Sequence, residues 1–327
     1  MSAPSIVGDP RWLPHDLDLD RRLIIFRRTS EDAVRGAGFL DGRTDIWTGQ
    51  DFELPFDAAD EVSPTKEGGR YIFHMSFCGS TLLARLLDRP GTSLTLREPD
   101  ILVKLADWRS ALLHAKLRSA DYDRILRFVE HLLFREWNSG EPVTVKPSSW
   151  ANNLIGDLHR PKTRSIFVTI ERETFAIAVL RGGRDRLAFA ARLASHLASA
   201  VAGGEALLRD AIESCSEPLA KAVKLALVAH ELQRRLFAEV SGQAAEVAFA
   251  SIEDGPSAAA QTAARILGLN FDQSSIESNV ARWASAHAKG QAVYSSSQRS
   301  SENAEVRRYH GEVIRGALAW ADATLGR

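Results

Sequence analysis

The chain has 327 residues, 45% of them hydrophobic, which suits one large α/β domain or two smaller domains with an ordinary core. Lys and Arg number 41 against 42 Asp and Glu, so the net charge of −1 creates no global field that attracts nucleic acid or an acidic membrane. Its two cysteines, Cys78 and Cys215, exclude a disulfide framework and fit a reducing cytosol. No apolar signal segment or membrane-spanning run is found, so we expect a cytoplasmic protein.

Residues 1–67 precede the most regular part of the chain, and we expect them to form an N-terminal extension packed on a main domain of residues 68–327. Leu23 to Phe26 is a candidate strand, and the cap signal Thr29–Ser30 predicts a short helix that runs to Ala37. The turn-forming stretch from Pro64 to Gly69, PTKEGG, marks the junction between the two parts.

The stretch from Arg70 to Asp88 organises the main domain. The apolar run Tyr71–Met75 predicts a buried strand, Ser76–Gly79 a tight loop, and Ser80–Leu87 a helix that opens with two hydroxyl residues. Unpaired N–H groups in the first turn of such a helix favour an anion, which indicates a phosphate site. Gly79 stands where a Walker A loop has lysine, and an ordinary capped strand–turn–helix remains the alternative.

Further short strands alternate with helical patterns along the rest of the chain. They are predicted at Ser93–Leu96, Pro142–Lys146, Arg164–Ile170 and Glu246–Ile252. This alternation predicts an α/β fold with a parallel sheet, whose ligands bind beyond the carboxyl ends of the strands. Residues 101–139 and 187–239 read as the candidate helical insert, and Glu305–Leu325 as a terminal helix. Residues 271–303 look less regular, with a loop at Ser295–Ser301.

Polar residues follow several of these strands in an order that resembles the sulfotransferase family, in particular its bacterial carbohydrate-type members. HMSFCGSTLLARLL, from His74, is similar to the family loop that holds the 5′-phosphosulfate of 3′-phosphoadenosine 5′-phosphosulfate. REPDIL, from Arg97, is similar to the segment whose glutamate acts as the base. IFVTIER, from Ile166, resembles the strand whose last arginine contacts the 3′-phosphate, and VKPSSW, from Val145, takes the place of a strand that ends in Lys-Thr-His. HAKGQAVYSSSQR, from His287, resembles the basic loop that closes over the nucleotide.

The resemblance implies a P-loop-like, three-layer αβα fold with a central, mostly parallel sheet and a helical insert. It implies transfer of a sulfuryl group from 3′-phosphoadenosine 5′-phosphosulfate to a hydroxyl or amine of a small molecule or sugar, without a metal. Nucleic acid and membrane are not expected as partners, and nothing indicates the oligomeric state.

The resemblance also assigns roles to individual residues. Glu98 would be the base, and Lys146 would supply the cation that family members carry where this chain has Phe77. The residues expected to hold the co-substrate are Phe77, Cys78, Gly79, Ser80, Thr81, Arg172, Lys289 and Arg299.

Each charged assignment has a structural alternative. Glu98 would instead pair with Arg97 or start a helix, Lys146 would end a strand in water, and Arg172 would pair with a neighbouring glutamate. His74 reads as a packed core residue rather than a base. Two other functions stay open: a phosphotransferase or nucleotide hydrolase that uses the same loop, and a non-catalytic nucleotide-binding protein, which Phe77 favours.

Overall fold

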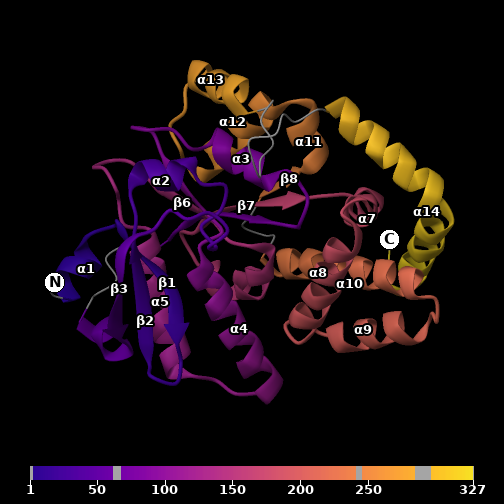
Figure 1. Ribbon diagram of the computed structural model, residues 1–327, viewed down its shortest axis with the longest axis horizontal. Coiled ribbons are helices and arrows are strands. Elements are labelled where there is room, and N and C mark those ends of the chain that lie inside the picture. Colours follow the sequence, from indigo (N-terminus) through magenta and orange to yellow (C-terminus); the bar gives the residue numbers. More distant parts are fainter. Residues whose placement is uncertain (1–2, 62–67, 241–244, 284–295, 327) are drawn as a thin grey trace.

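The computed structural model describes residues 3–61, 68–240, 245–283 and 296–326, and its fold is α/β (Figure 1). Five parallel strands form the main sheet in the order β5-β6-β4-β7-β8. They are β4 (Arg70–His74), β5 (Leu94–Arg97), β6 (Val143–Lys146), β7 (Arg164–Thr169) and β8 (Ala245–Ala248). The parallel sheet predicted from the strand–helix alternation is therefore confirmed.

Helices cover both faces of this sheet and give three layers (Figure 1). On one face the rings of Tyr71 and Phe73 stack at 5.1 Å, and Phe73 stacks on Phe167 at 5.5 Å. Phe237 of α10 (Pro218–Val240) and Phe134 at the end of α5 (Ala120–Leu133) pack on these rings. The other face is covered by α3 (Ser80–Leu86) and α12 (Pro256–Leu267). Continuous apolar strands are what a sheet covered on both faces requires.

The remaining helices connect the strands and extend the helical layers. Between β5 and β8 lie α4 (Asp100–Ala115), α5, η2 (Ser149–Leu154), α6 (Ile155–Leu158), α7 (Arg172–Arg181), α8 (Gly183–Ala198), α9 (Gly204–Glu213) and α10. Of the two ranges predicted for the helical insert, residues 101–139 contain α4 and α5, and residues 187–239 contain most of α8, with α9 and α10. Within the described part of the chain, no helix combines the length and the apolar character that crossing a membrane requires.

Three expectations for the C-terminal third were wrong. The strand expected over Glu246–Ile252 ends at Ala248, because α11 (Phe249–Asp254) follows directly. The less regular region contains α13 (Gln273–Trp283), and α14 runs from Ser296 to Thr324, so Ser296–Ser301 are helical rather than a loop. The Gln298 side chain donates to Glu302 at 3.0 Å, and α14 packs on α7 and α10. Such tertiary packing outweighs the weak helix propensity of serine.

The N-terminal residues form a separate three-stranded antiparallel sheet that packs on α4 and α5 (Figure 1). Its elements are α1 (Ala3–Gly8), β1 (Trp12–Asp18), β2 (Leu23–Arg28), α2 (Glu31–Gly36), β3 (Thr48–Pro55) and η1 (Phe56–Glu61). The predicted strand and capped helix are confirmed, since Ser30 Oγ accepts from the Ala33 amide at the start of α2.

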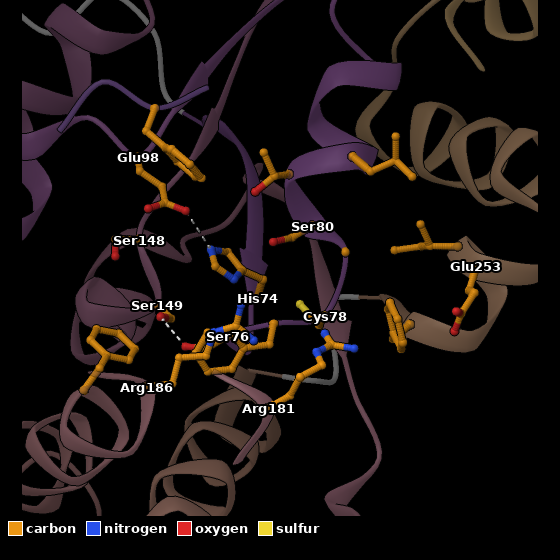
Figure 2. Close-up of a pocket in the computed structure, with 18 of the residues that line it drawn as sticks. His74, Ser76, Cys78, Ser80, Glu98, Ser148, Ser149, Arg181, Arg186 and Glu253 are labelled. Carbon is orange, nitrogen blue, oxygen red and sulfur yellow. Dashed lines mark hydrogen bonds and ion pairs between the residues drawn. The ribbon is translucent and has the colours of Figure 1, made fainter. Parts of the chain in front are cut away.

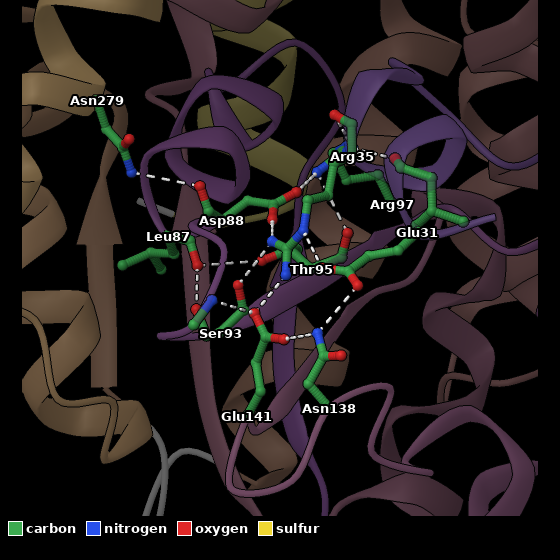
Figure 3. Close-up of polar contacts among 12 residues, drawn as sticks. Glu31, Arg35, Leu87, Asp88, Ser93, Thr95, Arg97, Asn138, Glu141 and Asn279 are labelled. Carbon is green, nitrogen blue, oxygen red and sulfur yellow. Dashed lines mark hydrogen bonds and ion pairs between the residues drawn. The ribbon is translucent and has the colours of Figure 1, made fainter. Parts of the chain in front are cut away.

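A buried ion network fixes this N-terminal part to the end of β5 (Figure 3). The Arg97 side chain is 1% exposed, pairs with Asp88, and donates to the backbone carbonyls of Val34 at 2.6 Å and Ala37 at 2.8 Å. Arg35 pairs with Asp88 and with Glu141. The residues after α2 are thereby held next to Glu98, which follows Arg97 in the chain.

Candidate functional site

A cavity of about 630 Å³ opens beyond the carboxyl ends of the strands, where a parallel sheet binds its ligands. Figure 2 shows the loop after β4 at its centre, with Glu98 on one side and Arg181 and Arg186 on the other. The walls come from the N-terminal segment, the loop after β4, the ends of β5 and β6, and helices α7, α8, α11 and α14. Segments far apart in the sequence therefore meet at one site.

The loop from Ser76 to Gly79 has two residues in the left-handed region, Phe77 with φ +64° and Gly79 with φ +74°. This backbone turns the chain directly into α3, and a Cβ added to Gly79 would lie 3.2 Å from the Phe249 ring. The amides of residues 79–82 donate to no backbone carbonyl of the described residues. The loop thus presents N–H groups beside the cavity, as an anion site requires.

The side chains of the loop are fixed by bonds within the protein. Ser76 Oγ and Ser149 Oγ lie 2.7 Å apart, and the Cys78 thiol donates to the Met75 carbonyl at 2.6 Å. Burial raises the pKa of the Cys78 thiol to about 11. Cys78 is therefore a neutral packing residue at neutral pH rather than a reactive thiolate.

Glu98 and Lys146 form a buried ion pair at the ends of β5 and β6. Lys146 Nζ lies 2.6 Å from Glu98 Oε1 and 2.9 Å from His74 Nε2, and the lysine side chain has no exposed surface. Burial raises the pKa of the Glu98 carboxyl, but the opposing effect of Lys146, followed by those of His74 and Arg43, leaves it below its ordinary value. The raised pKa that a neutral-pH base would have is thus not found, and Glu98 is ionised at neutral pH.

His74 is neutral in this arrangement. Burial, then the charge of Lys146, lowers the pKa of His74 to about 4. Its Nδ1 lies 2.8 Å from the Met75 carbonyl, and its Nε2 lies 3.0 Å from the Pro147 carbonyl and 2.9 Å from Lys146 Nζ, so both ring nitrogens are held by contacts within the protein. The interpretation of His74 as a packed residue agrees with this geometry.

Three arginines gather at the other end of the cavity, each from a different helix. Arg181 ends α7, Arg186 lies on α8 and Arg299 on α14. The Arg186 guanidinium lies 4.8 Å above the Phe77 ring, and that of Arg299 lies 4.7 Å above the Phe249 ring. Burial, then the charge of Arg181, lowers the pKa of both Arg186 and Arg299. Like charges held this close indicate a place for an anion.

These arginines also have partners within the protein. Arg299 pairs with Glu253, which itself lines the cavity, and Arg186 donates to the Ala178 carbonyl at 2.8 Å. Arg181 donates to Asn303 Oδ1 at 2.8 Å and lies 3.7 Å from Glu302. The bonds orient the guanidinium groups along the cavity wall.

Most of the residues predicted for the site lie together. Phe77, Cys78, Gly79, Ser80, Thr81, Glu98 and Arg299 line the cavity, and Lys146 lies directly behind Glu98. Arg172 is not brought to the cavity, since it lies 2.9 Å from Asp322 and 3.7 Å from Glu231. Lys289 lies outside the described residues.

Sequence reasoning missed several residues that line the cavity. Arg181 precedes the Gly182–Gly183 pair and Arg186 follows it by three residues, in a run RGGRDR whose two glycines indicate a helix break. Arg43 and Phe39 belong to the N-terminal extension, and no motif marks either of them. A basic residue on each side of a helix break near a predicted phosphate loop was the one signal available.

Among the described residues, no group of three or more His, Cys, Asp and Glu side chains is arranged to hold a metal ion. A comparison with models of known protein families found no family that matches the chain, and a comparison with curated proteins found no match either. Function is therefore inferred from the residues of the site.

Proposed function

We propose that the protein is a sulfotransferase that moves a sulfuryl group from 3′-phosphoadenosine 5′-phosphosulfate to a hydroxyl or amine of a small molecule or sugar. One observation carries the proposal: the loop after β4, the carboxylate of Glu98 and three arginines all line a single cavity. These are the parts that sulfuryl transfer needs, namely a cradle for the donor, a base for the acceptor and cations for the leaving phosphate.

The charge distribution supports a donor with two phosphate groups. The loop amides suit the 5′-phosphosulfate, and Arg181 and Arg299 suit a second phosphate some distance from it. Arg186 lies over Phe77, the residue at the place where the family resemblance expects a cation. We therefore assign to Arg186 the role of balancing charge on the leaving phosphate. The volume of about 630 Å³ is typical of a cavity for a ligand of this size.

In the proposed reaction an acceptor oxygen or nitrogen attacks sulfur, and the bond from sulfur to the 5′-phosphate oxygen breaks. The acceptor proton passes to a Glu98 oxygen, and the products are the sulfated acceptor and adenosine 3′,5′-bisphosphate. Lys146 holds Glu98 in place through Oε1, which leaves Oε2 toward the cavity side where Arg43 contacts it. Since Glu98 is a weak base, proton transfer belongs late in the step, when the acceptor atom is already acidified by the bond to sulfur.

Ligand binding tests the donor assignment without knowledge of the acceptor. Thermal unfolding is measured with adenosine 3′,5′-bisphosphate and, separately, with ATP and Mg²⁺. A ligand at a hundredfold excess over its Kd stabilises the folded state by about 2.7 kcal/mol. We expect the bisphosphate to raise the unfolding temperature and ATP–Mg²⁺ to raise it less.

Two variants sharpen the result. The double variant R181A/R186A removes two cavity arginines and is expected to weaken bisphosphate binding at least a hundredfold. Arg184→Ala is the control, because Arg184 is an exposed residue of α8, the helix that carries Arg186, and does not line the cavity. Equal binding by both variants contradicts the assignment of the arginines. Stabilisation by ATP–Mg²⁺ alone favours the phosphotransferase reading instead.

A further inference from the structure

The end of the cavity that contains Glu98 is built differently from the arginine end. Phe39, Asp41 and Glu98 all line it, two carboxylates beside an aromatic ring, and we name these three residues the Phe39 cage. The cage lies on the acceptor side of the loop, because Glu98 and the arginines Arg181 and Arg186 are on opposite sides of it (Figure 2).

A guanidinium of the protein itself occupies the Phe39 cage. Arg43 Nε lies 2.7 Å from Asp41 Oδ2, and Arg43 Nη2 lies 3.1 Å from Glu98 Oε2. The Arg43 Cζ lies 3.8 Å from the centroid of the Phe39 ring, a close cation–π contact. The cage therefore binds a flat cation by two carboxylates and one ring face.

The walls of the cage are more buried than the side chain that occupies it. The Leu40 amide donates to the Arg97 carbonyl at 2.8 Å, which anchors the segment that carries Phe39 and Asp41. Side-chain exposure is 19% for Asp41 and 12% for Glu98, but 52% for Arg43. Exchange of the Arg43 guanidinium for another cation would thus leave the walls in place.

The local charge count shows what would replace Arg43. With Arg43 withdrawn, Lys146 still pairs with Glu98, whereas Asp41 loses the guanidinium that pairs with it, so one negative charge is left unbalanced. Other carboxylates add to the negative charge near the cage. Burial raises the pKa of nearby Asp100 and Lys104 lowers it, but the charges of Asp16, Asp41 and Asp107 raise it as well, so the pKa of Asp100 stays above its ordinary value. A monocation restores the balance, whereas an anion would meet two carboxylates.

We propose that the Phe39 cage binds an ammonium or guanidinium group of the acceptor. In the free protein the Arg43 guanidinium occupies this position, and the acceptor displaces it. The identification of the ligand as the acceptor rests on the proposed function, whereas the cage as a cation site does not. An acceptor whose cationic group lies between the Phe39 ring and Asp41 has its reactive atom near Glu98 Oε2, the oxygen that takes the proton in the proposed reaction.

Binding of a small probe tests the cage directly. The butylguanidinium ion is titrated by calorimetry and ligand-detected NMR into the wild-type protein and into Arg43→Ala, without nucleotide. Because R43A lacks the competing side chain, we expect it to bind the probe at least tenfold more tightly than the wild type. The control is Arg21→Ala, which removes a 60%-exposed arginine paired with Glu53 on the same N-terminal extension. R21A is expected to bind as the wild type does.

Further variants keep the test decisive. Asp41→Asn or Phe39→Leu, each added to R43A, is expected to abolish the gain, because each removes one wall of the cage. R43Q replaces R43A if the latter has a lowered unfolding temperature. A probe affinity for R43A no higher than for R21A overturns the proposal. Tighter binding of butanoate than of butylguanidinium to the wild type also overturns it, because Arg43 would then be a receptor for anions.

The cation-site proposal and the sulfotransferase proposal can fail independently of each other. Tighter probe binding by R43A with no binding of adenosine 3′,5′-bisphosphate supports the cation site and rejects the sulfotransferase proposal. Bisphosphate binding without any gain in R43A rejects the cation site and leaves the sulfotransferase proposal standing.

Discussion

Lys146 Nζ lies 2.6 Å from Glu98 Oε1, in a pair that joins the ends of two neighbouring strands, β5 and β6. The register explains the contact, since Arg97 is opposite Lys146 and Glu98 is the next residue, with φ +55°. The Glu98 amide donates to the Lys146 carbonyl at 2.6 Å, so backbone and side chain both fix the carboxylate. Loss of the pair would therefore destabilise the end of β5 and also release the carboxylate of the proposed base.

Removal of the lysine from this pair should be strongly destabilising. In Lys146→Met, Glu98 keeps a buried charge without its closest cation, and breaking a buried pair in this way typically costs about 3–5 kcal/mol. We expect that loss in the free energy of unfolding, measured by urea denaturation. The double variant K146M/E98Q should recover part of it, because no unpaired charge remains.

Lys221→Met is the control for this experiment. Lys221 is a partly exposed residue of α10, so its replacement should change the free energy of unfolding by less than about 0.5 kcal/mol. Equal effects of K146M and K221M would show that the pair does not stabilise the fold.

A second prediction concerns the pH dependence of stability and follows from His74. Its pKa is about 4 in the folded protein against an ordinary value of 6.5. Between these two values the unfolded chain binds a proton at His74 and the folded chain does not, so the free energy of unfolding falls as the pH falls from 6.5 to 4. One such proton gives a slope of at most about 1.4 kcal/mol per pH unit.

The variant His74→Asn removes this contribution, and urea denaturation at pH 7, 6 and 5 measures the change in slope. Burial, then the charge of Arg27, also lowers the pKa of His15 to about 4. His15→Gln should therefore reduce the slope as well, and the two reductions should add in the double variant. A slope in H74N equal to that of the wild type would contradict a buried, neutral His74.

The sheet was predictable because its strands carry their own signal. The runs that became β4, β6 and β7 are apolar, and hydroxyl or proline residues stand between β4 or β6 and the helix that follows. Since parallel strands end at the same edge, the meeting of the loop after β4 with Glu98 and Lys146 followed from strand assignment alone. These contacts required no knowledge of how the helices pack.

The arginine end could not be predicted in the same way. Arg172 begins α7 shortly after the end of β7, but α14 places Asp322 2.9 Å from it, and Arg172 does not line the cavity. Arg181, at the other end of α7, lines the cavity instead. The choice between the two depends on how a helix more than 100 residues later docks on α7, which no local pattern in the sequence encodes.

A third prediction concerns the anchor of the N-terminal part. In Arg97→Met, Asp88 loses one of its two cations in a buried site (Figure 3). The carbonyls of Val34 and Ala37 lose their donor. We expect a loss of about 3–5 kcal/mol in the free energy of unfolding. Limited proteolysis should also cleave residues 3–61 faster in the variant, because the side-chain bonds from Arg97 to Val34 and Ala37 are lost.

Arg118→Met serves as the control for R97M, since Arg118 is exposed between α4 and α5. It should leave both stability and cleavage of the N-terminal residues unchanged. A variant R97M with wild-type stability would mean that the remaining contacts, those of Arg35 among them, hold the N-terminal sheet in place without Arg97.

The fourth prediction separates backbone strain from ligand binding at the loop. Gly79 has φ +74° and Gly91 has φ +75°, so Gly→Ala at either position forces alanine into the left-handed region. Each variant should lose about 1–2 kcal/mol in the free energy of unfolding, measured with urea.

At Gly79 the new Cβ also lies 3.2 Å from the Phe249 ring, whereas at Gly91 it meets no atom within 4 Å. We therefore expect G79A alone to weaken the binding of adenosine 3′,5′-bisphosphate, since only Gly79 shapes the amides beside the cavity. Equal affinity in G79A and G91A would show that the loop does not hold the anion.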